Sequence, residues 1–136
     1  QEIIFLPESD KFDVFRAADV ALACSGTVTT QLASAGVPTV VTYKLSAVTA
    51  FFVKRLYKPD YISLMNIAAN TELMPEFVQA DCRGDRLASA VLKYLENPEI
   101  AKSASAALLA QTAIMKGGGG LASKRAAATV LNLISG

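Results

Sequence analysis

The chain has no histidine and no tryptophan, and only two cysteines occur among its 136 residues. Without histidine it cannot form a Ser-His-Asp triad or a histidine acid/base pair, and two cysteines alone cannot build a four-ligand Cys/His zinc site. Cys24 and Cys82 lie far apart in the sequence and belong to no CxxC motif, so we expect free thiols in a reducing compartment. These absences exclude a large part of known enzyme chemistry.

An excess of one charge sign is also missing, because 13 Lys and Arg residues stand against 12 Asp and Glu residues, for a net charge of +1. Nucleic-acid-binding proteins normally carry a strong basic excess or a basic stripe, so we expect no nucleic-acid partner. The apolar runs are shorter than the roughly 18 to 20 residues that a membrane span requires, since Lys44, Lys54 and Arg55 interrupt them. The first residue is Gln1 and no signal-peptide pattern follows it, so we expect a chain cut from a longer protein.

Short apolar runs alternate with helical patterns, which is typical of a parallel sheet covered by helices on both sides. The runs at residues 3–6, 20–24, 38–43 and 61–64 predict about four strands. Helices are predicted at residues 11–18, 28–35, 46–57, 72–79, 85–95, 97–116 and 122–134, with a loop at 63–70 and a glycine joint at 117–120. We therefore expect a single α/β domain over residues 1–136, built on a Rossmann-like parallel sheet with flanking helices.

A candidate anion site lies where the second predicted strand meets a helix, at Ser25, Gly26 and Thr27. Glycine lets the backbone approach a ligand, and the first amides of the helix, at residues 27–29, direct their donors outward. The hydroxyls of Ser25 and Thr27 add hydrogen bonds to a phosphate, and Gln31, one turn further along, reaches an adjoining sugar hydroxyl. The alternative is an ordinary helix N-cap, because Ser and Thr are common at that position.

Two further sets of polar residues follow the predicted strands. Asn66 presents a donor and an acceptor to a phosphate or sugar, although a turn-forming asparagine is the commoner explanation. Glu72 and Glu76 lie four residues apart on one face of a predicted helix, which permits an acid/base pair. Like-charged carboxylates at this spacing are more often solvated surface, so both interpretations stay open.

Residues 20–59 contain no acidic side chain and carry four cations interleaved with aromatic residues. The cations are Lys44, Lys54, Arg55 and Lys58, and the aromatic residues are Tyr43, Phe51, Phe52 and Tyr57. A helix of this composition can lie against an anionic membrane surface or hold an acyl chain. Equally, the aromatic side chains can belong to the core, with the lysines at its solvated rim.

Four blocks of sequence, taken in their order and spacing, carry a resemblance to a known family. They are residues 18–29 (ADVALACSGTVT), 35–43 (AGVPTVVTY), 61–66 (YISLMN) and 72–76 (ELMPE). Together they resemble lipid-A-disaccharide synthase, and the match covers the C-terminal half of that enzyme. The resemblance implies the Rossmann-like, UDP-sugar-binding domain of a GT-B glycosyltransferase, with the N-terminal acceptor-binding domain absent.

That family transfers 2,3-diacylglucosamine from UDP-2,3-diacylglucosamine to 2,3-diacylglucosamine 1-phosphate, with inversion at the anomeric carbon, and the resemblance implies no metal or cofactor. By similarity, the turn at residues 25–27 receives the UDP diphosphate. Gln31 falls where the family usually has a glutamate suited to the ribose hydroxyls. Asn66 matches the asparagine of an SLPN segment, with Met65 in place of the proline, and Glu72 matches the acid of an AGRE-like stretch.

In that stretch Asn70 and Thr71 stand where the family has Gly and Arg, so a cation beside the leaving diphosphate is missing, and Lys44 is a candidate substitute. The resemblance places the general base in the absent domain, so we expect this chain alone to lack transferase activity. It also implies a cytoplasmic enzyme peripheral to the inner membrane, with membrane contact and homo-oligomerisation as further expectations. Two alternatives are a non-catalytic nucleotide-binding module, favoured by Gln31, and an oligomerisation module built from the alanine-rich helices after Asn97.

Overall fold

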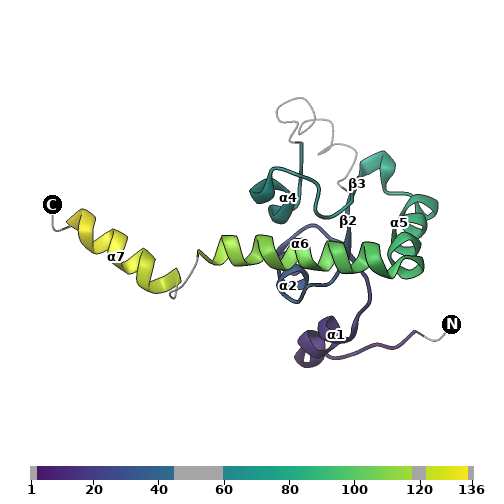
Figure 1. Cartoon of the computed structure of the whole chain (residues 1–136), viewed down its shortest axis with the longest axis horizontal. Coiled ribbons are helices and arrows are strands. Elements are labelled where there is room, and N and C mark those ends of the chain that lie inside the picture. The colour runs from purple at the N-terminus through teal and green to yellow at the C-terminus, as the bar shows by residue number, and fades with distance from the viewer. Residues whose placement is uncertain (1–2, 45–59, 118–121, 135–136) are drawn as a thin grey trace.

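The computed structural model describes residues 3–44, 60–117 and 122–134, in which a parallel sheet is packed against helices (Figure 1). The elements, in chain order, are η1 (Glu8–Asp10), α1 (Lys11–Ala17), β1 (Ala21–Cys24), α2 (Thr27–Ser34), β2 (Thr39–Tyr43), α4 (Leu64–Ala69), β3 (Glu76–Val78), η2 (Gln79–Asp81), α5 (Gly84–Glu96), α6 (Pro98–Lys116) and α7 (Ala122–Ile134).

The sheet of the described residues has three strands in the order β1-β2-β3, and both pairs are parallel. Its middle strand carries Val40 and Val41, which are both fully buried although consecutive side chains of a strand point to opposite faces. Both faces of β2 are therefore covered, as parallel sheets require. The α/β class with a Rossmann-like parallel sheet and flanking helices, which the sequence predicts, is confirmed.

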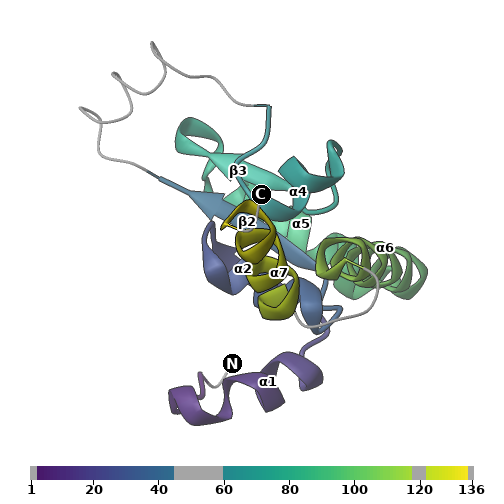
Figure 2. The same cartoon turned by 90° about the vertical axis from the view of Figure 1, so that its left-hand side faces the viewer.

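The hydrophobic core joins the sheet to three helices on one side of it. Ala33 of α2, Val41 of β2 and Leu108 of α6 are fully buried together, and Met65 of α4 and Met74 complete the cluster. Figure 2 shows α2, α4 and α6 beside strands β2 and β3 of the sheet. The core thus fixes the direction in which α2 leaves β1.

Helix α2 ends at a glycine that the packing requires. Gly36 has a φ of +74°, and its N–H and that of Val37 donate to the carbonyls of Ala33 and Leu32 in a Schellman motif. A Cβ at this position would lie 2.9 Å from the Ser105 hydroxyl oxygen. Long helix α6 therefore passes directly over the bare backbone at the end of α2.

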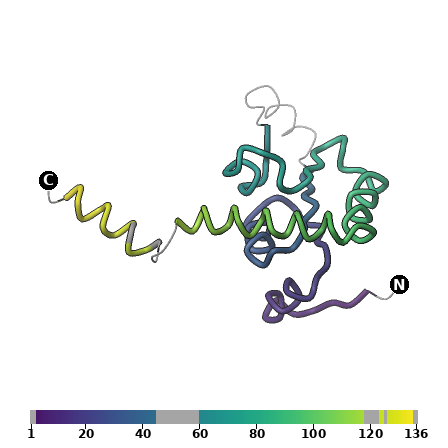
Figure 3. Tube along the Cα trace, in the orientation of Figure 1, coloured from purple at the N-terminus to yellow at the C-terminus, as the bar shows by residue number. Residues whose placement is uncertain are grey.

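Most predicted elements are confirmed within a residue or two: the helices corresponding to α1, α2, α5, α6 and α7, and the strands β1 and β2. The predicted helix at residues 46–57 lies outside the described residues. Helix α7 extends away from the rest of the molecule (Figure 3), with Val130, Leu131, Leu133 and Ile134 exposed. No helix of the described residues is both long enough and apolar enough to cross a bilayer.

Two of the four predicted strands are wrong. Residues 3–6 form no strand, because no described strand pairs with them, and Phe5 remains 91% exposed. Residues 61–64 lead into α4 instead, since the Ile62 N–H donates to the Glu76 carboxylate rather than to a neighbouring strand. The apolar residues at 62 and 65 pack into the core at the start of α4. A short apolar run alone does not distinguish such a helix start from a strand.

The predicted loop at residues 63–70 and the predicted helix at 72–79 are also wrong. The first contains α4, capped by Ser63 and ended by Asn70 in the left-handed conformation. The second contains β3, and the carbonyl of Pro75 accepts from the Val41 N–H across the sheet. A proline at this position argues against a helix interior, so Pro75 was the signal for the correct assignment.

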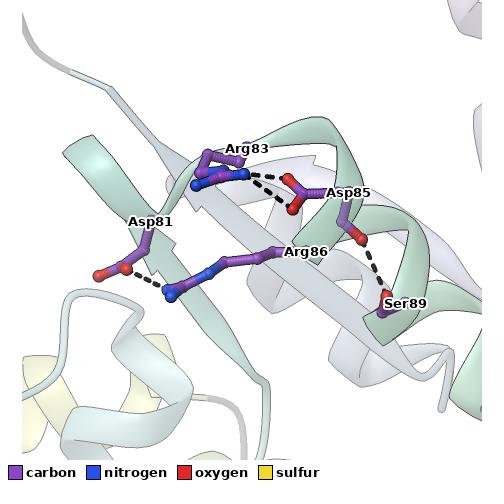
Figure 4. A network of polar contacts seen from close by, with 5 residues as sticks. All are labelled: Asp81, Arg83, Asp85, Arg86 and Ser89. Carbon is purple, nitrogen blue, oxygen red and sulfur yellow. Dashed lines mark hydrogen bonds and ion pairs between the residues drawn. The ribbon is translucent and has the colours of Figure 1, made fainter.

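The chain after β3 is tied to the start of α5 by exposed ion pairs (Figure 4). Arg83 pairs with Asp85 at 3.0 Å, Arg86 pairs with Asp81, and the Ser89 hydroxyl donates to the Asp85 carbonyl. Such exposed pairs contribute little stability each. Their effect is to hold the connection between η2 and α5 in one conformation.

Candidate functional site

The turn at residues 25–27 connects the carboxyl end of β1 to the N-terminus of α2. The Ser25 N–H donates to the Thr42 carbonyl at 3.0 Å, which continues the pairing of β1 with β2. The Thr29 hydroxyl donates to the Gly26 carbonyl at 2.6 Å, and the Thr29 N–H donates to the same oxygen at 3.2 Å. The expectation that the Thr29 amide faces a ligand is therefore wrong, and the amides of Thr27 and Val28 are the helix donors left for one.

Gly26 is not required by the packing of the described residues. Its φ of 160° is extended backbone that any residue adopts, and a Cβ built there meets nothing within 4 Å. Space is therefore open beside the backbone at the point where α2 begins. A ligand that approaches the Thr27 and Val28 amides would use this space, and a side chain at position 26 would enter it.

The remaining groups of the turn differ in their engagement. The Ser25 hydroxyl donates to the Ile62 carbonyl at 3.2 Å, so only its lone pairs remain for another partner. Thr27 is exposed, and Gln31, one turn along α2, is half-buried. Lys44 is exposed directly after β2, two residues past the Thr42 that pairs with Cys24. The turn thus has one exposed hydroxyl, two amide donors and a nearby cation.

Asn66 is fully buried and uses every hydrogen-bonding position of its side chain. Its Nδ2 donates to the Met74 carbonyl at 2.7 Å and to Glu76 Oε1 at 2.8 Å, and its Oδ1 accepts from the N–H groups of Leu73 and Met74 at 2.8 and 2.9 Å. Asn66 lies within α4 and not in a turn, and its side chain holds the backbone of Leu73 and Met74 in place. Direct contact of Asn66 with a ligand stays a prediction.

Glu76 lies in a strand and not in the helix that the sequence predicts at residues 72–79. Instead of sharing a helix face with Glu72, it begins β3, and its carboxylate accepts from the Ile62 N–H at 2.7 Å and from the Ser63 N–H at 2.8 Å. The expected helical pairing of Glu72 and Glu76 is wrong, because the segment between them is irregular and leads into a strand.

Glu72 lines a depression to which residues 25–27 do not contribute. It shares this shallow depression with Tyr94 near the end of α5 and with Glu99 and Ile100 in the first turn of α6. Burial raises the pKa of the Tyr94 hydroxyl above its usual range, and the negative charge of Glu72 adds to this. A donor-binding role of Glu72 stays a prediction.

Metal ligands are not gathered at the turn or elsewhere in the described ranges. No group of three or more Cys, Asp or Glu side chains within residues 3–44, 60–117 and 122–134 is placed to hold a metal ion. At the turn, the groups suited to an anion are the amides of Thr27 and Val28, the Thr27 hydroxyl and the side chain of Lys44.

An open parallel sheet with a Ser-Gly-Thr turn at a strand end defines a Rossmann-like α/β domain consistent with those of GT-B glycosyltransferases. A family model described as Lipid-A-disaccharide synthetase matches residues 2–129. The chain therefore belongs to the lipid-A-disaccharide synthetase family, a glycosyltransferase family of lipid A biosynthesis.

Individual relatives agree with this assignment. A lipid-A-disaccharide synthase of Rhodospirillum centenum is 40% identical over 134 residues, which cover 98% of this chain and 33% of the relative. The corresponding enzyme of Paramagnetospirillum magneticum is 42% identical over 128 residues, covering 92% and 33%. That of Geobacter sulfurreducens is 38% identical over 123 residues, covering 90% and 32%. The chain spans one third of the length of these curated relatives.

Proposed function

We propose that this chain is the UDP-sugar-binding part of a lipid-A-disaccharide synthase, and that the turn at residues 25–27 receives the diphosphate of the donor. The observation that carries the proposal is the open space beside Gly26, next to the Thr27 and Val28 amides, which have no partner among the described residues. The partial positive charge of a helix N-terminus stabilises a diphosphate in that position. UDP is the nucleotide that the resemblance to lipid-A-disaccharide synthase implies.

The remaining donor contacts follow from the same placement. Thr27 adds a hydroxyl to the phosphates, and Gln31, one turn further along α2, faces the ribose with one acceptor oxygen. Lys44, exposed after β2, supplies positive charge as UDP departs. We assign Asn66 to shaping the neighbouring turn, because its side chain is fully engaged within the protein.

The reaction in this proposal is inverting transfer of 2,3-diacylglucosamine from its UDP conjugate to 2,3-diacylglucosamine 1-phosphate. The residues of this chain bind the donor and stabilise the leaving diphosphate, and the general base belongs to the part of the relatives that this chain does not span. Because both substrates are diacylated lipids, we place the reaction at the cytoplasmic surface of the inner membrane.

Isothermal titration of UDP, UMP and inorganic phosphate into the chain tests the donor-binding proposal. Tighter binding of UDP than of UMP or phosphate supports it, because the turn is assigned to the diphosphate. Substitution of Gln31→Glu, the residue usual in the family, tests the ribose assignment. A gain in UDP affinity supports a ribose contact, and an unchanged affinity contradicts it.

Oligomerisation is a second candidate function, favoured by the exposed apolar side chains of α7. Val130, Leu133 and Ile134 are 54, 79 and 77% exposed on a helix that lies apart from the sheet (Figure 1). Sedimentation velocity over a range of concentrations tests this function. A mass that rises with concentration supports it, and a strict monomer contradicts it.

A further inference from the structure

The carboxylate of Glu76 is the most heavily engaged acidic group of the described residues. Its Oε2 accepts from the Ile62 N–H at 2.7 Å, and its Oε1 accepts from the Ser63 N–H and from Asn66 Nδ2, both at 2.8 Å. Three donors from one segment therefore converge on one side chain of β3. Hydrogen bonds to a charged acceptor are among the stronger ones in proteins.

These contacts continue to the turn at residues 25–27. The Ile62 N–H is held by Glu76, and the carbonyl of the same residue accepts from the Ser25 hydroxyl at 3.2 Å. Ser25 is also held through its N–H by Thr42 of β2. The residue that precedes Gly26 is thus fixed between the sheet on one side and the Ile62 backbone on the other.

We propose that Glu76 is a positioning residue of the donor site, which acts through Ile62 and Ser25 without touching the ligand. This inference rests on the proposed function of the turn as the diphosphate site. In it, the carboxylate holds residues 62 and 63 so that the Ile62 carbonyl lies within reach of the Ser25 hydroxyl. The amides of Thr27 and Val28 then keep a fixed direction before a ligand arrives, which lowers the ordering cost of binding.

All three partners of the Glu76 side chain are donors, so position 76 requires a side chain whose two terminal atoms both accept hydrogen bonds. Glutamine at position 76 has nearly the same shape, but its amide nitrogen donates and would face either the Ile62 N–H or the two donors on the other oxygen. The Ile62 N–H would lose its partner in the first orientation, and the Ser63 N–H and Asn66 Nδ2 would lose theirs in the second. The Glu76→Gln change therefore disturbs the Ile62 segment while it leaves the side-chain volume unchanged.

The test compares Glu76→Gln with the matched control Glu96→Gln, which removes the same charge from an exposed position at the end of α5. Amide NMR of the 136-residue chain gives the resonances of residues 25–28, 62 and 63, and titration with UDP gives the dissociation constant. Measurements are made well below the unfolding midpoint of each variant, so that a loss of stability alone does not change the affinity. Should Glu76→Gln not fold, Glu76→Asp, which keeps the charge on a shorter side chain, takes its place.

We expect Glu76→Gln to shift the amides of Thr27 and Val28 in the absence of ligand and to weaken UDP binding about tenfold. Glu96→Gln is expected to change neither. In a Ser25→Ala background the effect of Glu76→Gln becomes smaller, because the connection to the turn is already broken. Unchanged UDP affinity in Glu76→Gln, or fully additive effects of the two substitutions, overturns the positioning role and leaves the proposed function intact. Absence of UDP binding by the wild-type chain overturns the proposed function and this inference together.

Discussion

Ser25 and Ile62 lie 37 positions apart in the chain, and a hydrogen bond of 3.2 Å from the Ser25 hydroxyl to the Ile62 carbonyl joins them. This contact connects the turn that begins α2 with the segment that begins α4. Two of the sequence blocks that resemble lipid-A-disaccharide synthase, residues 18–29 and 61–66, are thereby brought together in space.

Asn66→Ala is expected to destabilise the chain by about 3 kcal/mol, because the substitution leaves the N–H groups of Leu73 and Met74 and the Met74 carbonyl without partners. Urea unfolding gives the free energy. Asn97→Ala is the control, since the Asn97 side chain makes one exposed hydrogen bond to the Lys93 carbonyl and its loss is expected to cost less than about 1 kcal/mol. Equal losses in the two variants would contradict a structural role for Asn66.

Gly26→Ala is expected to leave the free energy of unfolding nearly unchanged while it weakens UDP binding about tenfold or more. The backbone at Gly26 is extended and its Cβ position is open, so folding tolerates the methyl group, but the methyl enters the space assigned to the diphosphate. Gly84→Ala is the matched control, because its Cβ position is also open and it lies in the first turn of α5. UDP affinity that Gly26→Ala leaves intact would argue against a diphosphate beside this residue.

The stability of the chain is expected to fall at alkaline pH partly because of Tyr94. Burial and the Glu72 charge raise the pKa of this hydroxyl above 10.0, so the folded state keeps the proton more tightly than the unfolded state does. The resulting contribution is fully present below about pH 10 and is lost as the pH rises through the folded pKa. Urea unfolding between pH 8 and 11 should therefore show a steeper alkaline loss for the wild type than for Tyr94→Phe. Parallel curves would show that this hydroxyl does not contribute.

The 136-residue chain is expected to release no UDP from UDP-2,3-diacylglucosamine in the presence of the acceptor lipid. It spans one third of its curated relatives, and the proposal places the general base outside that third. Liquid chromatography of UDP gives the rate, with a full-length relative as the positive control. Turnover near the rate of that relative would contradict the assignment of the base.

The strands and helices that the sequence predicts correctly share a regular signal. The strand β2 is a continuous apolar run, α5 and α6 are long helical patterns, and the glycine at position 36 marks the end of α2. Between residues 60 and 78 that signal fails, because the elements are short. Their geometry depends on Asn66 and Glu76, whose partners lie up to 14 positions away.

In the candidate site, too, the local features are predictable from the sequence and the long-range contacts are not. The turn at Ser25, Gly26 and Thr27 is predictable because a strand end followed by a helix N-terminus is a local pattern. The hydrogen bonds of the Thr29 and Asn66 side chains within the protein are not predictable, since they depend on which donors and acceptors the fold brings near them. The proposed positioning role of Glu76 rests on its hydrogen bond with the Ile62 N–H. This contact is not predictable, because the sequence places the two residues in different predicted elements.

In the proposed function the amides at the start of α2 bind the diphosphate of UDP, and amide NMR during a UDP titration tests this binding residue by residue. We expect shifts that are largest at Thr27 and Val28 and that saturate with UDP at lower concentration than with UMP. Shifts at Gln31 are expected with the nucleotides and not with inorganic phosphate. Millimolar UDP that leaves Thr27 and Val28 unshifted, or that shifts residues elsewhere in the chain instead, would contradict it.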